Sequence, residues 1–165
     1  MKILGIDPSI NHSGWSIIEF DTDLHRYIDG GVISYKQNIP LSHKLSKIYK
    51  FLENILRNHN IKHIAMEKSF INVNALTSMK LSYARAVVMT LAGHDLGINL
   101  IEYSPNYIKK TIVGNGHASK DQIAYFLKFL INDLPKSFIK SDHTDAIAIA
   151  YTYAKNFLNI NNIST

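Results

Sequence analysis

The sequence predicts a single α/β domain in which a five-stranded mixed β-sheet is covered by helices on both faces. Two patterns support this fold class: three β-rich segments follow one another at the N-terminus, and amphipathic helices then alternate with short apolar strands. The predicted order is β-β-β-α-β-α-β-α-α. Consecutive strands favour an antiparallel meander, whereas strands separated by helices favour parallel pairing. The length of 165 residues and the lack of a linker or repeat favour one domain over residues 1–165, with the last few residues as a flexible tail.

The first three strands are expected over Lys2–Ile6, Gly14–Phe20 and Tyr27–Tyr35. All three are rich in the apolar, β-branched and aromatic residues that strands favour. The polar segments Ser9–Ser13 and Asp21–Arg26 lie between them and have the composition of turns. These segments predict the antiparallel meander.

Two helices and the fourth strand are expected in the middle of the chain. Ser42–Arg57 repeats apolar residues at helical spacing, Lys62–Met66 is a short apolar strand, and Val73–Leu96 is a long helical segment. The apolar stripe of the first helix comprises Leu45, Ile48, Phe51, Leu52, Ile55 and Leu56. The residues of the second helix expected to face the core are Leu76, Met79, Ala84, Val87, Val88 and Leu91.

The last third of the chain predicts one strand and two helices. Ile98–Tyr103 is the fifth strand. Ser119 and Gln122 have the spacing of a capping box, which predicts that a helix begins there. Its apolar face is expected to comprise Ile123, Phe126, Leu127 and Leu130. The final helix is expected to begin at Ser141 or Asp142 and to run to about Leu158.

The composition limits the classes of partner. The net charge of +5 favours an anionic partner such as nucleic acid, although a charge of this size also serves solubility alone. The absence of cysteine excludes disulfides, thiolate metal sites and cysteine nucleophiles. No apolar run has the length of a membrane span and no signal peptide is recognisable, so we expect a cytoplasmic protein with no membrane partner.

Four acidic residues stand beside apolar segments. Asp7 and Glu67 each follow a predicted strand, while Asp142 and Asp145 open the final helix. If the first and fourth strands are parallel neighbours, their acids lie together at the carboxyl edge of the sheet, where open α/β sheets bind ligands. The helical pair is about 5–6 Å apart on one face. The four carboxylates could hold two divalent cations for hydrolysis of a phosphodiester.

Each acid also has a structural interpretation. Asp7 followed by proline is typical of a turn, and Glu67 could pair with Lys68. Asp142 and Asp145 could simply stabilise the start of a helix. The placement of all four at strand ends and at one helix start favours the metal site.

Five segments carry a distinctive pattern: Gly5-Ile-Asp-Pro-Ser9, Ala65-Met-Glu-Lys-Ser-Phe70, Lys80-Leu-Ser-Tyr-Ala-Arg85, Lys109-Lys-Thr-Ile-Val-Gly-Asn-Gly-His-Ala-Ser-Lys120 and Asp142-His-Thr-Asp-Ala-Ile-Ala-Ile-Ala150. In order and spacing they resemble those of RuvC, the Holliday-junction resolvase family of the ribonuclease H-like superfamily. The resemblance extends from Met1 to about Tyr153. It implies a ribonuclease H-like fold and an endonuclease that resolves four-way DNA junctions in recombination and repair, leaving 5′-phosphate and 3′-hydroxyl ends. It also implies a homodimer and a branch-migration helicase complex of the RuvA/RuvB type as partner.

The resemblance also implies roles for individual residues. Asp7, Glu67, Asp142 and Asp145 resemble the family's metal ligands, for two Mg²⁺ ions per active site, and Mn²⁺ can substitute. Lys109 and Lys120 resemble basic residues near the scissile phosphate. Phe70 resembles a ring that stacks on a junction base, although an apolar core position is the alternative. Arg85 is a weaker candidate for phosphate binding, and its helix could instead face the second subunit of a dimer.

Two further positions raise questions. Ser9 stands where the family has glycine, which matters if the backbone there requires a positive φ. His143 adjoins Asp142, but it points about 100° away around the helix, so we expect it beside the helix start or a phosphate and not as a ligand.

Two other functions remain open from the residues. A ribonuclease H-type enzyme acting on RNA–DNA hybrids would share the acids but would need neither Phe70 nor a dimer. A non-catalytic junction-binding or regulatory module would bind junctions and leave them intact.

Overall fold

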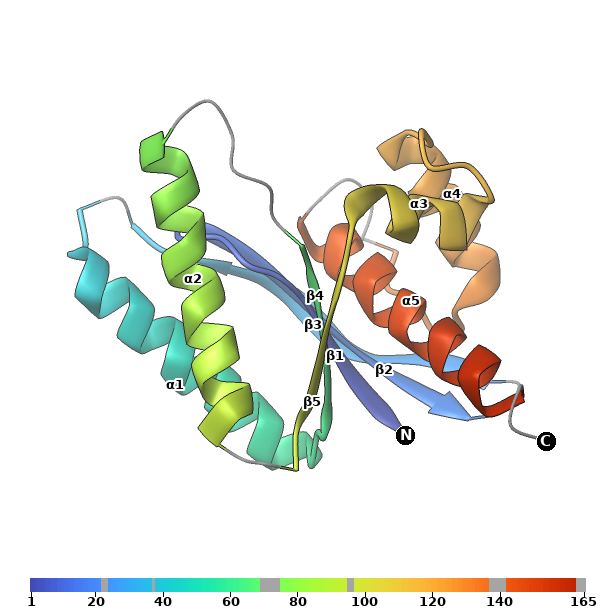
Figure 1. Ribbon diagram of the computed structural model, residues 1–165, viewed down its shortest axis with the longest axis horizontal. Helices are drawn as coiled ribbons and strands as arrows, with labels where there is room; N and C mark the ends of the chain where they lie inside the picture. Colours follow the sequence, from blue (N-terminus) through green and yellow to red (C-terminus); the bar gives the residue numbers. More distant parts are fainter. Residues whose placement is uncertain (22–23, 37, 69–74, 95–96, 137–141, 163–165) are drawn as a thin grey trace.

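The computed structural model describes residues 1–165 except 22–23, 37, 69–74, 95–96, 137–141 and 163–165, and the side chains of 158–162 are also outside the description. Its single five-stranded sheet has the strand order β3-β2-β1-β4-β5. Helices lie on both faces of this sheet (Figure 1). The predicted α/β fold class is confirmed.

The sheet is mixed, as predicted. β1 (Lys2–Asp7), β2 (His12–Asp21) and β3 (Leu24–Ser34) form the antiparallel meander. β4 (His63–Glu67) pairs parallel with β1, and β5 (Asn99–Tyr103) pairs parallel with β4. β1 is therefore the central strand, and it carries an acid at its carboxyl end.

The helices form two layers (Figure 1). α1 (Leu41–His59) and α2 (Ala75–His94) cover one face of the sheet. α5 (Asp142–Asn162) lies across the other face with α3 (Pro105–Val113) and α4 (Lys120–Leu130) beside it. None of the helices, within the residues described, has the length and apolar content needed to cross a membrane.

The core is divided in two by the sheet, because successive strand residues point to opposite faces. In β1, Ile3 packs on the α5 side, whereas Leu4 and Ile6 pack against α1 and α2. The predicted stripe of α1 is confirmed, since its most buried apolar residues are Ile48, Leu52, Ile55 and Leu56. The alternation in β1 also places Asp7 on the α5 side.

Three apolar residues predicted to face the core are exposed. Leu76 and Met79 of α2 are 71% and 51% exposed, whereas Val88 and Leu91 of the same helix are buried as predicted. The first turns of α2 extend past the ends of the strands, so no sheet surface lies beneath them (Figure 1). Phe126 of α4 is 39% exposed, since this helix packs mainly through Ile123 and Leu127.

The predicted element order lacks one helix, α3. Ser104 begins it, because the Ser104 side chain accepts a hydrogen bond from the Tyr107 amide and Pro105 occupies the first helical position. Gly114 ends it in the left-handed conformation with φ 81°. The serine, proline and glycine signals were present in the sequence. The capping box at Ser119 and Gln122, by contrast, is confirmed.

Candidate active site

Two acids meet because β1 and β4 are parallel and in register. Ile6 pairs with Met66, so the next residues, Asp7 and Glu67, both stand at the carboxyl ends of neighbouring strands. Strand alternation sends Asp7 to the same face as Ile3, toward α5. The predicted strand-end placement is confirmed for both acids.

The first turn of α5 supplies the other two acids, Asp142 and Asp145. α5 approaches the sheet so closely that two glycines are required beneath it. A Cβ atom at Gly5 would lie 2.1 Å from the Ala146 carbonyl oxygen, and one at Gly14 would lie 1.9 Å from the Asp142 carbonyl oxygen. These side-chain-free positions let the helix begin directly above the end of β1.

The carboxylates converge on one cleft. Ligand oxygens of Asp7, Asp142 and Asp145 lie within 4.8 Å of one another. Glu67 is outside that close group but lines the same cleft, which has a volume of about 350 Å³. The structure thus brings all four predicted acids to one place, with three of them close enough to share a single cation.

Burial and mutual repulsion disfavour the ionised form of carboxylates in the cleft. The pKa of Asp7 is raised to about 7, first by burial and then by the nearby carboxylates of Asp145, Glu67 and Asp142, against the opposing effect of Lys120. The pKa of Glu67 is also raised, first by burial and then by Asp145. An added cation would relieve this repulsion, which is the electrostatic condition for a metal site.

Two lysines border the carboxylates. Lys120 Nζ, at the start of α4, donates to Asp145 Oδ2 at 2.6 Å, and this hydrogen bond raises the pKa of Lys120. Lys109 projects from α3 and lines the same cleft, where its charge opposes the raised pKa of Glu67. Both predicted lysines therefore lie at the acids, and Lys109 is placed there by α3, the helix missing from the predicted element order.

Arg85 requires a correction, because it is not on a surface that could meet DNA phosphate. It is 8% exposed on α2, where its guanidinium donates to the Glu67 backbone carbonyl and to the Glu102 carboxylate of β5. Arg85 thus holds the end of the strand that carries Glu67. Glu102 was not singled out from the sequence, where its only signal was an acid inside an apolar strand.

The remaining predicted positions have different outcomes. Phe70 lies outside the described residues. His143 stands in the first turn of α5, as predicted, and it is buried facing β3, where its Nε2 lies 3.3 Å from the Tyr27 hydroxyl. Ser9 does not have a positive φ, since the non-glycine residues with this conformation in the described chain are Asn60 and Asp133. Serine therefore adds no backbone strain to the loop.

Comparison with known proteins gives a consistent result. A family model described as crossover junction endodeoxyribonuclease RuvC matches residues 3–153. Crossover junction endodeoxyribonuclease RuvC of Rickettsia massiliae (strain Mtu5) is 40% identical over 154 residues, covering 92% of this chain and 96% of the relative. The corresponding protein of Ehrlichia canis (strain Jake) is 38% identical over 156 residues, with coverages of 94% and 99%.

Solved structures are similar as well. Thermus thermophilus RuvC in complex with Holliday junction substrate superimposes with a TM-score of 0.88 at 25% identity, over 96% of each chain. The yeast mitochondrial Holliday junction resolvase Ydc2 shares the fold at 16% identity, with a TM-score of 0.67 over 99% of this chain and 84% of that one.

Proposed function

Because the chain belongs to the RuvC family of crossover junction endodeoxyribonucleases, we propose that it resolves four-way DNA junctions by metal-dependent hydrolysis of phosphodiesters. The observation that carries the proposal is the convergence of the four acids on one cleft bordered by Lys109 and Lys120. Such a cleft combines carboxylates that can hold a metal ion with lysine ammonium groups that can bind a phosphate.

The donor set fits a hard divalent cation. Every candidate ligand is a carboxylate oxygen, and three of them lie within 4.8 Å of one another. Magnesium favours oxygen ligands and few protein carboxylates per ion, so Asp7, Glu67, Asp142 and Asp145 are sufficient to hold two Mg²⁺ ions, or two Mn²⁺ ions in their place. When bound, these ions supply Lewis acidity to the scissile phosphodiester.

The protein side chains position the substrate. In this proposal, Lys120 and Lys109 bind non-bridging oxygens of the scissile phosphate and stabilise the charge that develops on it. Water supplies the new oxygen on phosphorus, and the bond to the 3′ oxygen breaks, which leaves a 5′-phosphate and a 3′-hydroxyl. The paired residues Lys120 and Asp145 must then exchange partners when substrate enters, because Asp145 already accepts a hydrogen bond from this lysine.

The proposal is tested by incubating the purified protein with a synthetic mobile junction, with and without Mg²⁺, and mapping the nicks. We expect paired nicks at symmetric positions only when the metal is present. Junctions that are bound but left intact under all metal conditions would favour a non-catalytic module. Faster cutting of an RNA–DNA hybrid than of the junction would favour a ribonuclease H-type enzyme.

The metal-free cleft is expected to destabilise the protein in a pH-dependent manner. Since the pKa of Asp7 is raised from 3.8 to about 7, ionised Asp7 opposes folding from about pH 4 upward, and the effect is complete above pH 7. The full shift corresponds to about 4 kcal/mol, and relaxation of the solvated cleft reduces the expected effect to about 2 kcal/mol. Asp7→Asn should therefore raise the melting temperature of metal-free protein by about 4–8 °C at pH 8 and by nothing at pH 3.5.

The control for this measurement is Glu53→Gln, which removes an acid that pairs with Arg57 on α1, far from the cleft. Mg²⁺ should raise the melting temperature of the wild type more than that of Asp7→Asn. Equal melting temperatures of wild type and Asp7→Asn at pH 8 without metal would contradict the expected repulsion.

A homodimer forms part of the proposal, with α2 as its interface. Leu76, Met79 and Tyr83 are 71%, 51% and 39% exposed and recur at helical spacing, which gives α2 a largely exposed apolar stripe. An isologous contact between two such helices buries both stripes and orients two active sites by a two-fold axis.

The interface is tested by Met79→Glu. A carboxylate in an apolar interface should weaken dimerisation at least about tenfold, which sedimentation at several protein concentrations measures. Phe129→Glu is the control, because Phe129 is 72% exposed but lies on α4, on the opposite side of the sheet. Equal dissociation constants for the two variants would contradict an interface at α2.

We propose three further elements, for which family membership is the support. Phe70 stacks on a junction base, a branch-migration complex of the RuvA/RuvB type presents the junction, and the reaction takes place in the cytoplasm. Slower junction cutting by Phe70→Ala at an unchanged melting temperature would support the first of these.

A further inference from the structure

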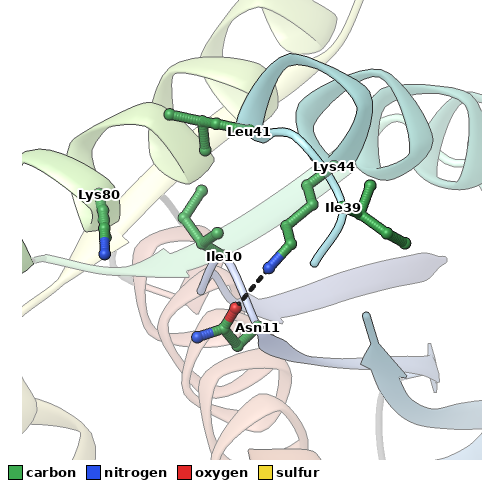
Figure 2. A pocket seen from close by; sticks show the side chains of 6 residues that line it. All are labelled: Ile10, Asn11, Ile39, Leu41, Lys44 and Lys80. Atoms are coloured by element: carbon green, nitrogen blue, oxygen red, sulfur yellow. Dashed lines mark hydrogen bonds between the residues drawn. The ribbon is translucent and has the colours of Figure 1, made fainter. Parts of the chain in front are cut away.

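A second pocket adjoins the turn that follows β1. It has a volume of about 360 Å³ and lies between this turn and the starts of α1 and α2. Its lining residues are Ile10, Asn11, Ile39, Leu41, Lys44 and Lys80 (Figure 2). Two of the six are cations and none is an acid, so the pocket has the charge of an anion site.

Lys44 is the central feature of this pocket. It is only 5% exposed, and its Nζ donates to Asn11 Oδ1 at 2.9 Å (Figure 2). A lysine ammonium has three donors, and a buried cation is costly unless it is paired. Within the described part of the chain, Lys44 has no carboxylate partner. An anion in the pocket would supply the missing charge.

The start of α1 adds to the positive potential. Pro40 precedes the helix and offers no side-chain cap, and the first turn contains no acid. Leu41 of this turn lines the pocket, so the positive end of the helix dipole lies at its wall. Lys80 of α2 contributes a second ammonium from the other side of Ile10 (Figure 2).

We infer that this pocket binds a backbone phosphate of the same DNA arm whose scissile phosphate occupies the carboxylate cleft. The inference rests on the proposed function. Asp7 of the cleft and Asn11 of the pocket are four residues apart, so their Cα atoms are separated by at most about 14 Å. Phosphates of one strand succeed each other every 3.4 Å along a duplex axis, so the second phosphate lies on the order of four nucleotides or fewer from the scissile one.

The role of the pocket is to hold the strand in register over the acids. Phosphate contacts fix the position of a protein on DNA without reading its sequence. Lys44 and Asn11 belong to structure that is formed before DNA binds, so the contact requires little ordering of side chains. A phosphate held here would align the scissile phosphodiester of the same strand with Asp7.

The test is equilibrium binding of a four-way junction without divalent metal, as a function of salt concentration. Lys44→Met removes the charge and keeps much of the apolar stem. It should lower the affinity for the junction about tenfold at 0.1 M salt. It should also reduce the salt slope, which is the steepness with which log affinity falls with log salt concentration, by about 1. Lys50→Met is the matched control, since Lys50 is exposed about 9 Å further along α1 and does not line the pocket. It should leave the slope close to that of the wild type.

A scan of junctions with single neutral methylphosphonates locates the phosphate. Neutralising one non-scissile phosphate should weaken binding by the wild type and have no effect on Lys44→Met, because the two changes remove the same contact. Lys80→Gln is a second variant, and it keeps the fold because this side chain is exposed. It should also reduce the salt slope of junction binding, and it replaces Lys44→Met in the test if that variant does not fold.

The outcomes separate the two proposals. Wild-type protein that neither binds nor cuts junctions would refute the proposed function. The phosphate pocket alone would be refuted if the wild type binds and cuts junctions while Lys44→Met and Lys80→Gln have the same salt slope as Lys50→Met. Loss of the dimer in Lys44→Met at an unchanged salt slope would also refute it, because the pocket would then serve the second subunit.

Discussion

Asp7→Asn is expected to reduce cleavage of a four-way junction at least about 10³-fold while leaving the affinity for the junction within about threefold. Asparagine has nearly the same shape as aspartate but lacks its charge. Asp7 belongs to the group of three acids whose oxygens lie within 4.8 Å, so its loss removes one charge from the cation site. The electrostatic contribution of a bound cation to phosphodiester hydrolysis amounts to several kcal/mol, and each 1.36 kcal/mol is tenfold in rate.

The measurement pairs single-turnover cleavage in saturating Mg²⁺ with equilibrium binding in its absence. Glu53→Gln serves as the control, because this acid pairs with Arg57 on the other face of the sheet and should change neither quantity. A loss of binding as large as the loss of cleavage would mean that Asp7 supports the DNA-binding surface and not the reaction alone. Cleavage by Asp7→Asn within tenfold of the wild-type rate would mean that Asp7 is not required for the reaction.

The position of the acids could be predicted in part, because local rules place each acid at a strand end or a helix start, whereas their convergence required the assumption that the first and fourth strands pair in parallel. An acid that ends a buried strand lies at an edge of the sheet, and strand alternation decides its face. Two acids three residues apart at a helix start share one side of that helix. With that assumed pairing, the sequence predicted one site for Asp7, Glu67, Asp142 and Asp145, and the structure adds that Glu67 stands outside the closest group.

Other features depend on neighbours that are distant in sequence. In sequence, the stripe of Leu76 and Met79 has the same pattern whether it faces a core or a second molecule. Only the length of α2 relative to the sheet distinguishes these two cases. α3 has the signals of a helix start and end, but its nine residues include isoleucine, threonine and valine, which obscure the helical pattern. An exposed and a buried arginine are likewise identical in sequence, as Arg85 illustrates.

Arg85→Ala is expected to lower the stability of the protein by about 3 kcal/mol. The change leaves the Glu102 carboxylate and the Glu67 carbonyl without their guanidinium partner, and breaking a buried ion pair from one side typically costs this much. For a chain of this length, the melting temperature should fall by about 6–12 °C. Arg57→Ala is the matched control, since Arg57 forms an exposed pair with Glu53 and its loss should cost less than about 0.5 kcal/mol.

A double variant separates stability from catalysis. Arg85→Met combined with Glu102→Leu removes both charges, and such replacements are often close to neutral in stability. Because Arg85 also fixes the backbone at Glu67, the double variant should still cut junctions more slowly than the wild type, at unchanged junction affinity. A different result would contradict this role: a melting temperature of Arg85→Ala equal to that of Arg57→Ala, together with a salt slope of junction binding smaller by about 1. Arg85 would then contact a phosphate, and its buried position between α2 and β5 would not be that of the active protein.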